Sequence, residues 1–162
     1  MLRSLFNRLS GRRNTPAPQA DPPQGCYTIC YRSEATRPFS EDEMNSLLLG
    51  ARMRNVSAGI GGLLIHNRFR FWQILEGPQD YVEAAFARIS RDHRHDNVIT
   101  IERGPRNARK FPDFEMGELD ISTMPEDDPL RCDFEALFNG TTDSDKAEAA
   151  ERLTRFFKWR KG

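Results

Sequence analysis

The sequence predicts an α+β domain, one sheet covered by helices, and two observations support this prediction. Five short segments rich in β-branched and aromatic residues have the length of strands. Two longer segments between them carry apolar residues every three to four positions, which is the period of a helix. The order strand, helix, strand, strand, helix, strand is that of a ferredoxin-like βαββαβ sandwich. An added fifth strand and C-terminal helices complete the predicted fold.

Composition limits the class of protein. The chain has 162 residues, enough for one domain with extensions, and Lys+Arg and Asp+Glu each number 24. Without a net charge, we expect no nucleic acid among its partners. No apolar run reaches the ~18–20 residues of a transmembrane segment. Cys26, Cys30 and Cys132 lack metal-ligand spacing, so we predict no metal site. Cys26 and Cys30 would lie ~13 Å apart on an extended segment, too far for a disulfide, so we predict reduced thiols in a soluble, cytoplasmic protein.

Three regions are expected along the chain: an N-terminal tail (1–24), a folded domain (25–122) and a C-terminal helical extension (123–162). The first 13 residues of the tail contain four arginines, no acid, and apolar residues at helical spacing. Four prolines then exclude regular structure. The tail is therefore disordered, or an organelle transit peptide, or a short amphipathic helix lying on an anionic membrane.

The first strand and the first helix each contribute one polar residue of interest. The strand Cys26–Ser33 places Tyr31 on one face with the other alternate residues. The helix begins at a capping box formed by Ser40 and Glu43. Asn55 continues its apolar stripe by one turn, at the helix end and on the core side. There Asn55 either terminates the helix in a left-handed conformation or contacts a ligand.

Two strands joined at residues 66–68 are expected to form a hairpin, the first containing Leu63–Ile65. The second contains Phe71–Leu75, an apolar run interrupted by the amide of Gln73. A buried amide that lacks a hydrogen-bond partner costs roughly 1–3 kcal/mol. Gln73 must therefore bond to another side chain or to a ligand.

The second helix is expected to begin at a capping box formed by Asp80 and Glu83. The same helix carries Arg88, Asp92 and His95 on one face, at positions i, i+4 and i+7. Such a row is ordinarily a set of solvated ion pairs.

The last strands are predicted at Val98–Arg103 and Phe114–Ile121, the latter carrying Met116. Two amphipathic helices then follow an acidic linker. They are too short to be stable alone, so we expect them to pack on the domain or on a partner. On the domain they can cover the sheet face that carries Trp72 and Ile74. Their apolar stripes are Leu130, Phe134, Leu137 and Phe138, then Ala150, Leu153, Phe156 and Phe157.

The predicted topology brings the polar residues together. The first and third strands are expected to be parallel neighbours at the sheet centre, with both helices on one face. Tyr31 and Gln73 then meet in the groove between the helices, near Asn55 and the charged face of the second helix. A phenol, two amides and charged groups around an apolar cleft suit a planar heteroaromatic ligand.

Several blocks of the sequence resemble the BLUF family, bacterial blue-light sensors that bind a flavin, usually FAD. The resemblance covers about residues 26 to 122 and implies non-covalent binding of FAD, with FMN or riboflavin as alternatives. The blocks are Tyr31-Arg32-Ser33, Arg54-Asn55 to Gly62-Leu63-Leu64, Phe71-Trp72-Gln73-Ile74-Leu75-Glu76-Gly77, Arg91-Asp92-His93-Arg94-His95, and Arg109-Lys110-Phe111 through Met116.

The resemblance implies roles by position. Tyr31 matches the tyrosine that passes an electron and a proton to the excited flavin. Gln73 matches the amide that hydrogen-bonds flavin N5 and O4 and then rearranges. Met116 matches the strand residue that responds to this glutamine. The further flavin contacts that the resemblance implies are Asn55, at the pyrimidine edge of the ring, and Arg88, Asp92, Arg94 and His95 of the second helix.

Two positions depart from the family pattern: Phe114 replaces a common tryptophan, and Gly61 a usual threonine. Neither affects Tyr31 and Gln73, so the resemblance implies a photoreceptor that turns over no substrate and signals by altering its contacts. An unidentified downstream protein is its expected partner, with a homo-oligomer as a further option. The alternatives are a ferredoxin-like interaction module without photochemistry and a flavin enzyme, although no G-x-G-x-x-G fingerprint opens a helix.

Overall fold

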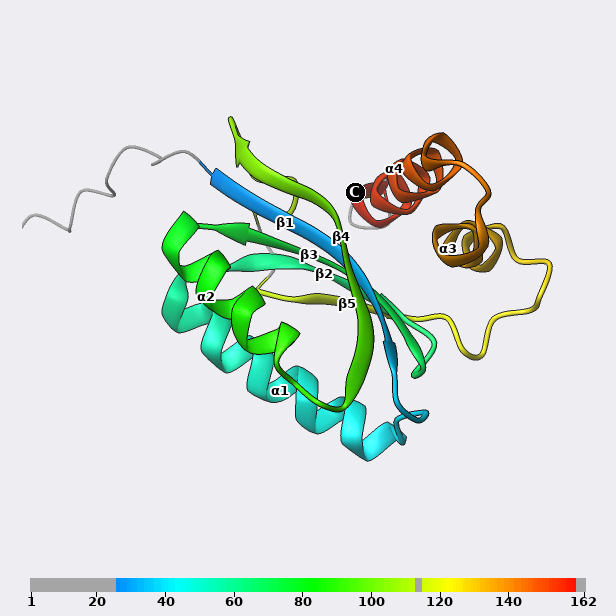
Figure 1. The fold of residues 1–162 in the computed structure, drawn as a ribbon, viewed down its shortest axis with the longest axis horizontal. Helices are drawn as coiled ribbons and strands as arrows, with labels where there is room; N and C mark the ends of the chain where they lie inside the picture. Colours follow the sequence, from blue (N-terminus) through cyan, green and yellow to red (C-terminus); the bar gives the residue numbers. More distant parts are fainter. Residues whose placement is uncertain (1–25, 113–114, 160–162) are drawn as a thin grey trace, which may run out of the picture.

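The computed structural model describes residues 26–112 and 115–159, with side chains described up to residue 156. The predicted tail (1–24) and Phe114 lie outside these residues. The described part is an α+β fold in which one sheet separates two pairs of helices (Figure 1). Its elements are β1 (Cys26–Ala35), α1 (Glu41–Ala58), β2 (Gly61–His66), β3 (Arg70–Gly77), α2 (Gln79–Ser90), β4 (His95–Arg106), β5 (Gly117–Asp120), α3 (Pro129–Asn139) and α4 (Asp143–Trp159).

The sheet has the order β4-β1-β3-β2-β5, which is the ferredoxin-like order with β5 added beside β2. β1 and β3 are central neighbours, as predicted, but they are antiparallel, so the expected parallel pairing is wrong. The crossover through α1 makes β1 and β2 run in the same direction, with space for one strand between them. The hairpin turns the chain back into that space, so β3 runs opposite to both. β5 lies parallel to β2.

The two helices on the first face begin differently. At α1 the predicted capping box is present: the Glu43 N–H donates to Ser40 Oγ, and the Glu43 carboxylate accepts from the Ser40 N–H. At α2 the capping box predicted from Asp80 and Glu83 is wrong. Pro78 occupies the N-cap position, so Asp80 already lies inside the first turn, and Glu83 pairs with Arg103 of β4 instead.

The strand bounds also differ from those predicted. β1 extends two residues further, and β4 begins at His95 and ends at Arg106 because the strand pairs with β1 along nearly its whole length. β5 is short, and Met116 comes directly before it instead of within it. The row predicted on the second helix is broken as well, because α2 ends at Ser90 and His95 already belongs to β4.

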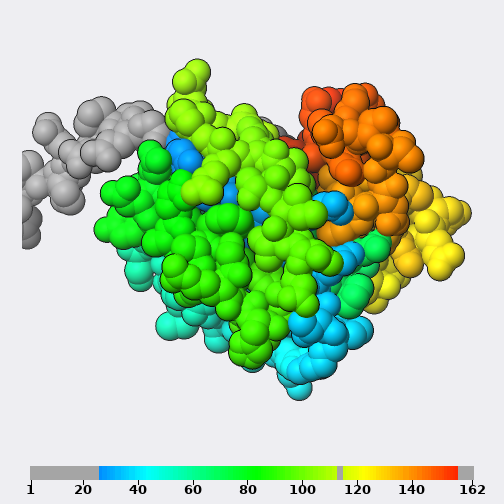
Figure 2. All heavy atoms as spheres, viewed as in Figure 1, coloured from blue at the N-terminus to red at the C-terminus, as the bar shows by residue number. Residues whose placement is uncertain are grey.

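Each face of the sheet has its own hydrophobic core. The first core packs α1 and α2 on alternate residues of β1 and β3, among them Ile29 and Leu75. The second packs α3 and α4 on the opposite face, where Trp72 and Ile74 belong to one cluster with the helix residues Phe134 and Leu153. The expectation that the C-terminal helices cover Trp72 and Ile74 is therefore confirmed. Figure 2 shows α3 and α4 joined to one side of the body that α2 and β4 dominate in this view.

Candidate functional site

A cavity of about 310 Å³ lies between the sheet, α1 and α2. Its volume is within the range of small-molecule pockets, about 300–1,000 Å³. Apolar side chains form most of its walls, including Leu47, Leu64 and Ile89. All the predicted site residues line it: Tyr31, Asn55, Gln73, Arg88, Asp92, Arg94, His95 and Met116.

Three of these residues form one hydrogen-bonded chain. Tyr31 and Gln73 lie opposite each other in the β1–β3 register, and the Tyr31 hydroxyl donates to Gln73 Oε1. Gln73 Nε2 in turn donates to the sulfur of Met116, 3.3 Å away. This assignment fixes the amide orientation, because the phenol needs an acceptor and the thioether cannot donate. The buried amide of Gln73 thus has partners on both sides within the protein.

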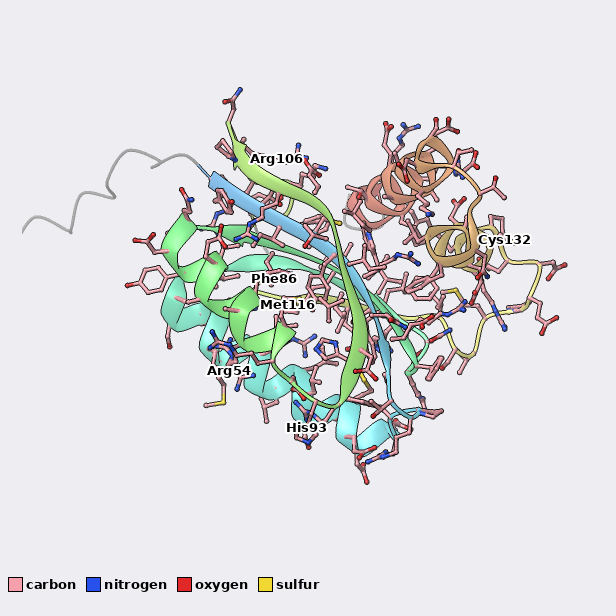
Figure 3. The ribbon with its side chains drawn as sticks, in the orientation of Figure 1. Arg54, Phe86, His93, Arg106, Met116 and Cys132 are labelled. Atoms are coloured by element: carbon pink, nitrogen blue, oxygen red, sulfur yellow. The ribbon has the colours of Figure 1, made fainter. Side chains whose placement is uncertain are left out.

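The phenol of Tyr31 lies in an apolar setting. Only 3 % of the residue is exposed, and its ring packs on Phe86 of α2 with 5.2 Å between the ring centroids. Phe86 and Met116 are both labelled in Figure 3, between α2 and the sheet. Burial raises the pKa of Tyr31 well above its usual value, with smaller contributions from Cys30 and Asp92. The phenol therefore keeps its proton unless a strong oxidant removes an electron at the same time.

Asn55 does not end its helix. α1 continues to Ala58, and Gly59 adopts the left-handed conformation, with φ at 63°, so the interpretation of Asn55 as a left-handed terminator is wrong. Asn55 is 4 % exposed, and its Nδ2 donates to the carbonyl of Glu115 at 2.9 Å. This bond holds the amide at the cavity wall, where it can also address a ligand.

Three polar side chains, Asp92, Arg94 and His95, lie between the end of α2 and the first residue of β4. The Arg94 guanidinium pairs with Asp92 and lowers the pKa of that carboxyl to about 2. His95, at the start of β4, has its Nδ1 2.9 Å from Ser33 Oγ and its Nε2 2.6 Å from the Ile89 carbonyl. Ser33 was not predicted as a site residue, although it shares a strand face with Tyr31 by the period of two.

Arg54 is a second lining residue that the sequence analysis did not assign to the site. It projects from α1 on the side of α2 (Figure 3). Burial, and then the charge of Arg54, lower the pKa of Arg88 on α2. Among the described residues neither guanidinium has an ion-pair partner. An anionic group at this wall would offset the repulsion between the two guanidinium groups, because a negative charge within a few ångströms stabilises the charged form of an arginine.

These features fit a flavin mononucleotide or dinucleotide. The apolar walls suit the planar ring system, and Gln73 and Asn55 offer amide groups to its polar edge. Arg54 and Arg88 suit a phosphate, since arginine is the preferred partner of phosphate groups. The fold and the site together describe a ferredoxin-like domain whose cavity, between two helices and the sheet, suits a planar, anionic cofactor.

Comparison with known proteins identifies the family. Residues 26–117 match the family model described as BLUF, sensors of blue light using FAD. The photoactivated adenylate cyclase subunit beta of Euglena gracilis is 39 % identical over 85 residues, which are 52 % of this chain and 10 % of that protein. The blue light- and temperature-regulated antirepressor BluF of Escherichia coli K12 is 28 % identical over 131 residues, 81 % of this chain and 32 % of that protein.

A solved structure agrees with these matches. The dark-state structure of BlrB, a BLUF protein, superposes with a TM-score of 0.63 at 28 % identity, over 78 % of this chain and 97 % of that one. The chain belongs to the BLUF family of flavin-binding blue-light sensors. It spans only a tenth to a third of the length of the curated relatives described above.

Proposed function

We propose that the cavity between α1 and α2 holds FAD, with FMN or riboflavin as alternatives, and that Tyr31, Gln73 and Met116 convert light absorption into a structural signal. The observation that carries this proposal is the hydrogen-bonded chain from the Tyr31 hydroxyl through the Gln73 amide to the Met116 sulfur. Arg88, Asp92, Arg94, His95 and Asn55 are the further residues that we propose as contacts of the cofactor.

When bound, a photoexcited flavin supplies a strong one-electron oxidant. Tyr31 is the oxidisable group that faces the cavity, and burial keeps its phenol protonated before light arrives. Loss of an electron makes a phenol a strong acid, so electron and proton leave Tyr31 together. When both return to Tyr31, the chain has the same atoms and charges as before. What differs is the orientation or tautomer of the Gln73 amide.

The amide of Gln73 is suited to this role because a half-turn exchanges its donor and its acceptor. In the structure Nε2 faces the Met116 sulfur. After a half-turn Oε1 would face that sulfur, and neither atom carries a hydrogen. The contact then loses its hydrogen bond, so Met116 is expected to move. Gln73 would therefore act as the switch and Met116 as the relay to β5.

We propose that the signal leaves as a change in protein contacts and not as turnover of a substrate. Residues 25–122 would be the sensor and residues 123–162 the responding extension, since α3 and α4 pack on the sheet face behind Gln73. Among the described residues no helix has the length and apolarity to cross a bilayer. Cys26, Cys30 and Cys132 are all free thiols, which supports a reducing cytoplasm as the location. A downstream protein or a second copy would receive the signal.

The absorption spectrum of the purified protein tests this proposal. We expect a yellow protein whose flavin band shifts to the red under blue light and returns in the dark. Tyr31→Phe keeps the ring and its packing but removes the phenol, so this variant should bind flavin without a stable shift. A full shift in that variant would show that the donor is misassigned. A colourless wild-type protein that takes up no flavin would favour an interaction module without photochemistry.

A further inference from the structure

Two side chains of α1 hold the backbone that carries Met116. Arg52 Nε donates to the carbonyl of Met116 at 3.2 Å, and Asn55 Nδ2 donates to the carbonyl of Glu115 at 2.9 Å. The spacing of Arg52 and Asn55 is i, i+3, which places two side chains on the same side of a helix. Consecutive carbonyls of the chain are thus fixed from one helix face.

These two bonds form a clamp on the backbone, which matters because the hydrogen bond to the Met116 sulfur is weak, although the side chain is buried in the first core. A thioether is a weak acceptor, so the 3.3 Å contact from Gln73 Nε2 cannot by itself fix the residue. Met116 also lies outside β5, and its position is therefore not set by the sheet ladder. At the start of the same connection, the buried carboxylate of Glu76 accepts the backbone N–H groups of Lys110 and Phe111. The clamp formed by Arg52 and Asn55 holds the other end of this connection, at Met116.

Arg52 reaches one step further, to β5. Its Nη2 lies 3.8 Å from the carboxylate of Glu118, whose other oxygen is 3.1 Å from Nε2 of the buried His66 on β2. The guanidinium of Arg52 therefore contacts both Met116, whose sulfur bonds to Gln73, and Glu118 of β5. A movement of the Met116 backbone would stretch or break the bond between Arg52 and the Met116 carbonyl.

We infer that Arg52 is a positioning residue: it holds Met116 where the sulfur meets the Gln73 amide, and it favours the return of Met116 to that place after light. The first part concerns the protein in the dark and stands on geometry alone. The second part rests on the proposed function. Arg52 does not line the cavity, so this role is separate from contact with the flavin.

The first part is tested in the dark, on the flavin-loaded protein, by NMR of methionine methyl groups labelled with ¹³C. The chain has five methionines, so the resonances can be assigned by single substitutions. Arg52→Ala should move or broaden the resonance of Met116 and leave that of Met124 in place. Arg68→Ala is the matched control, because Arg68 also pairs with a carboxylate of β5, Asp120, but donates to neither carbonyl of the clamp.

Glu118→Gln separates the two contacts of Arg52, since it weakens the ion pair and leaves the carbonyl bond. We expect it to leave the Met116 resonance near its wild-type position. The inference is overturned if Arg52→Ala leaves the resonance unchanged, or if Arg68→Ala or Glu118→Gln moves it as far as Arg52→Ala does.

The second part is tested by the rate of dark recovery of the flavin spectrum. Without the clamp Met116 must find its place unaided, so Arg52→Ala should slow recovery by about threefold or more, the effect of one lost hydrogen bond. Arg68→Ala should recover at the wild-type rate. A wild-type rate in Arg52→Ala contradicts this part. Absence of any light-induced shift in the wild-type protein would instead contradict the proposed function, and the dark NMR comparison would still test the clamp.

Discussion

At the scale of single residues, the site depends on two buried side chains, the protonated phenol of Tyr31 and the hydrogen-bonded amide of Gln73. An apolar wall raises the pKa of Tyr31 above the usual value of a phenol. Gln73 depends on the same burial, since its amide is shielded from water and must bond to Tyr31 and Met116. Burial thus keeps the phenol protonated and able to donate. It also makes the hydrogen bonds of the Gln73 amide depend on which way the amide points.

The first prediction is that the light-induced shift survives alkaline pH. An exposed tyrosine loses its proton near pH 10, whereas the raised pKa keeps Tyr31 protonated in the folded protein. Above pH 10 Tyr31 loses its proton in the unfolded chain but keeps it in the folded protein. The contribution of Tyr31 to the free energy of unfolding is therefore constant below pH 10 and becomes less favourable as the pH rises further. The amplitude of the red shift should therefore be constant from pH 7 to about 10. A loss of amplitude with a midpoint below 10 would contradict the assignment of Tyr31.

The second prediction distinguishes the phosphate side of the cavity from the ring side. Arg88→Ala should weaken the binding of FMN by about tenfold, which corresponds to the loss of a hydrogen bond to a charged group. The affinity for riboflavin, which has no phosphate, should be nearly unchanged. Asn55→Ala should weaken both ligands several-fold, because the amide would contact the ring. Dissociation constants from flavin fluorescence provide the measurement. Arg91→Ala, an exposed arginine outside the cavity, is the control. Equal losses for FMN and riboflavin in Arg88→Ala would exclude a phosphate contact.

At the scale of elements, β3 connects the two faces of the sheet. Its odd-numbered residues, among them Gln73, face α1 and α2, whereas Trp72 and Ile74 face α3 and α4. β2 must lie close to β3 for this arrangement to hold. At Gly62 the approach is so close that an added Cβ would lie 1.9 Å from the carbonyl oxygen of Ile74. A glycine at position 62, inside β2, is therefore required by the contact between two backbones.

The third prediction follows from this contact. Gly62→Ala should force β2 away from β3 and destabilise the fold by about 1–3 kcal/mol, the usual cost of overpacking. Flavin binding should weaken with it, because Leu64 and Gln73 line the cavity from these two strands. Thermal unfolding checks the effect. Gly104→Ala is the control, since a Cβ there would meet no atom within 4 Å and only its positive φ opposes it. Equal stability of Gly62→Ala and wild type would contradict the close approach.

At the scale of the whole molecule, α3 is tied to the strands that carry the Tyr31–Gln73 pair. The guanidinium groups of Arg32 and Arg70 lie 5.3 and 5.0 Å from the ring centre of Phe138. Arg70 also pairs with Glu34 of β1 and Glu135 of α3. Arg32 adjoins Tyr31 in the chain, so these contacts connect β1 and β3 to the end of α3.

The fourth prediction is that blue light loosens the C-terminal helices. A moved Gln73 and Met116 would shift the central strands and bias the contact with α3 and α4 between two arrangements. Hydrogen exchange of residues 130–156 should therefore be faster under steady blue light than in the dark. Phe138→Ala, which removes the ring between the two arginines, should reduce this difference. Identical protection in the two states, with the spectral shift present, would mean that these helices are permanent packing.

The sequence by itself determined the elements and the strand faces that carry the candidate site residues Tyr31 and Gln73. Within residues 26–112 and 115–159, periodicity predicted the order of the strands and helices, and the capping box at Ser40 and the hairpin before Gln73 are present as predicted. These features are local, because side-chain spacing and turn residues act within a few positions of the chain. The predicted site residues also proved to line one cavity, since alternation along β1 and β3 decides which side chains share a face.

Only the tertiary structure decided how the elements pair and which distant groups meet. Periodicity shows which face of a strand is apolar but not its direction. The parallel pairing expected for β1 and β3 was wrong, because a crossover followed by a hairpin into the space between β1 and β2 requires β3 to run opposite to both. The meeting of Ser33 with His95, and of Arg52 with the Met116 carbonyl, joins residues more than 60 positions apart. Such contacts depend on crossover and register, which no local pattern encodes.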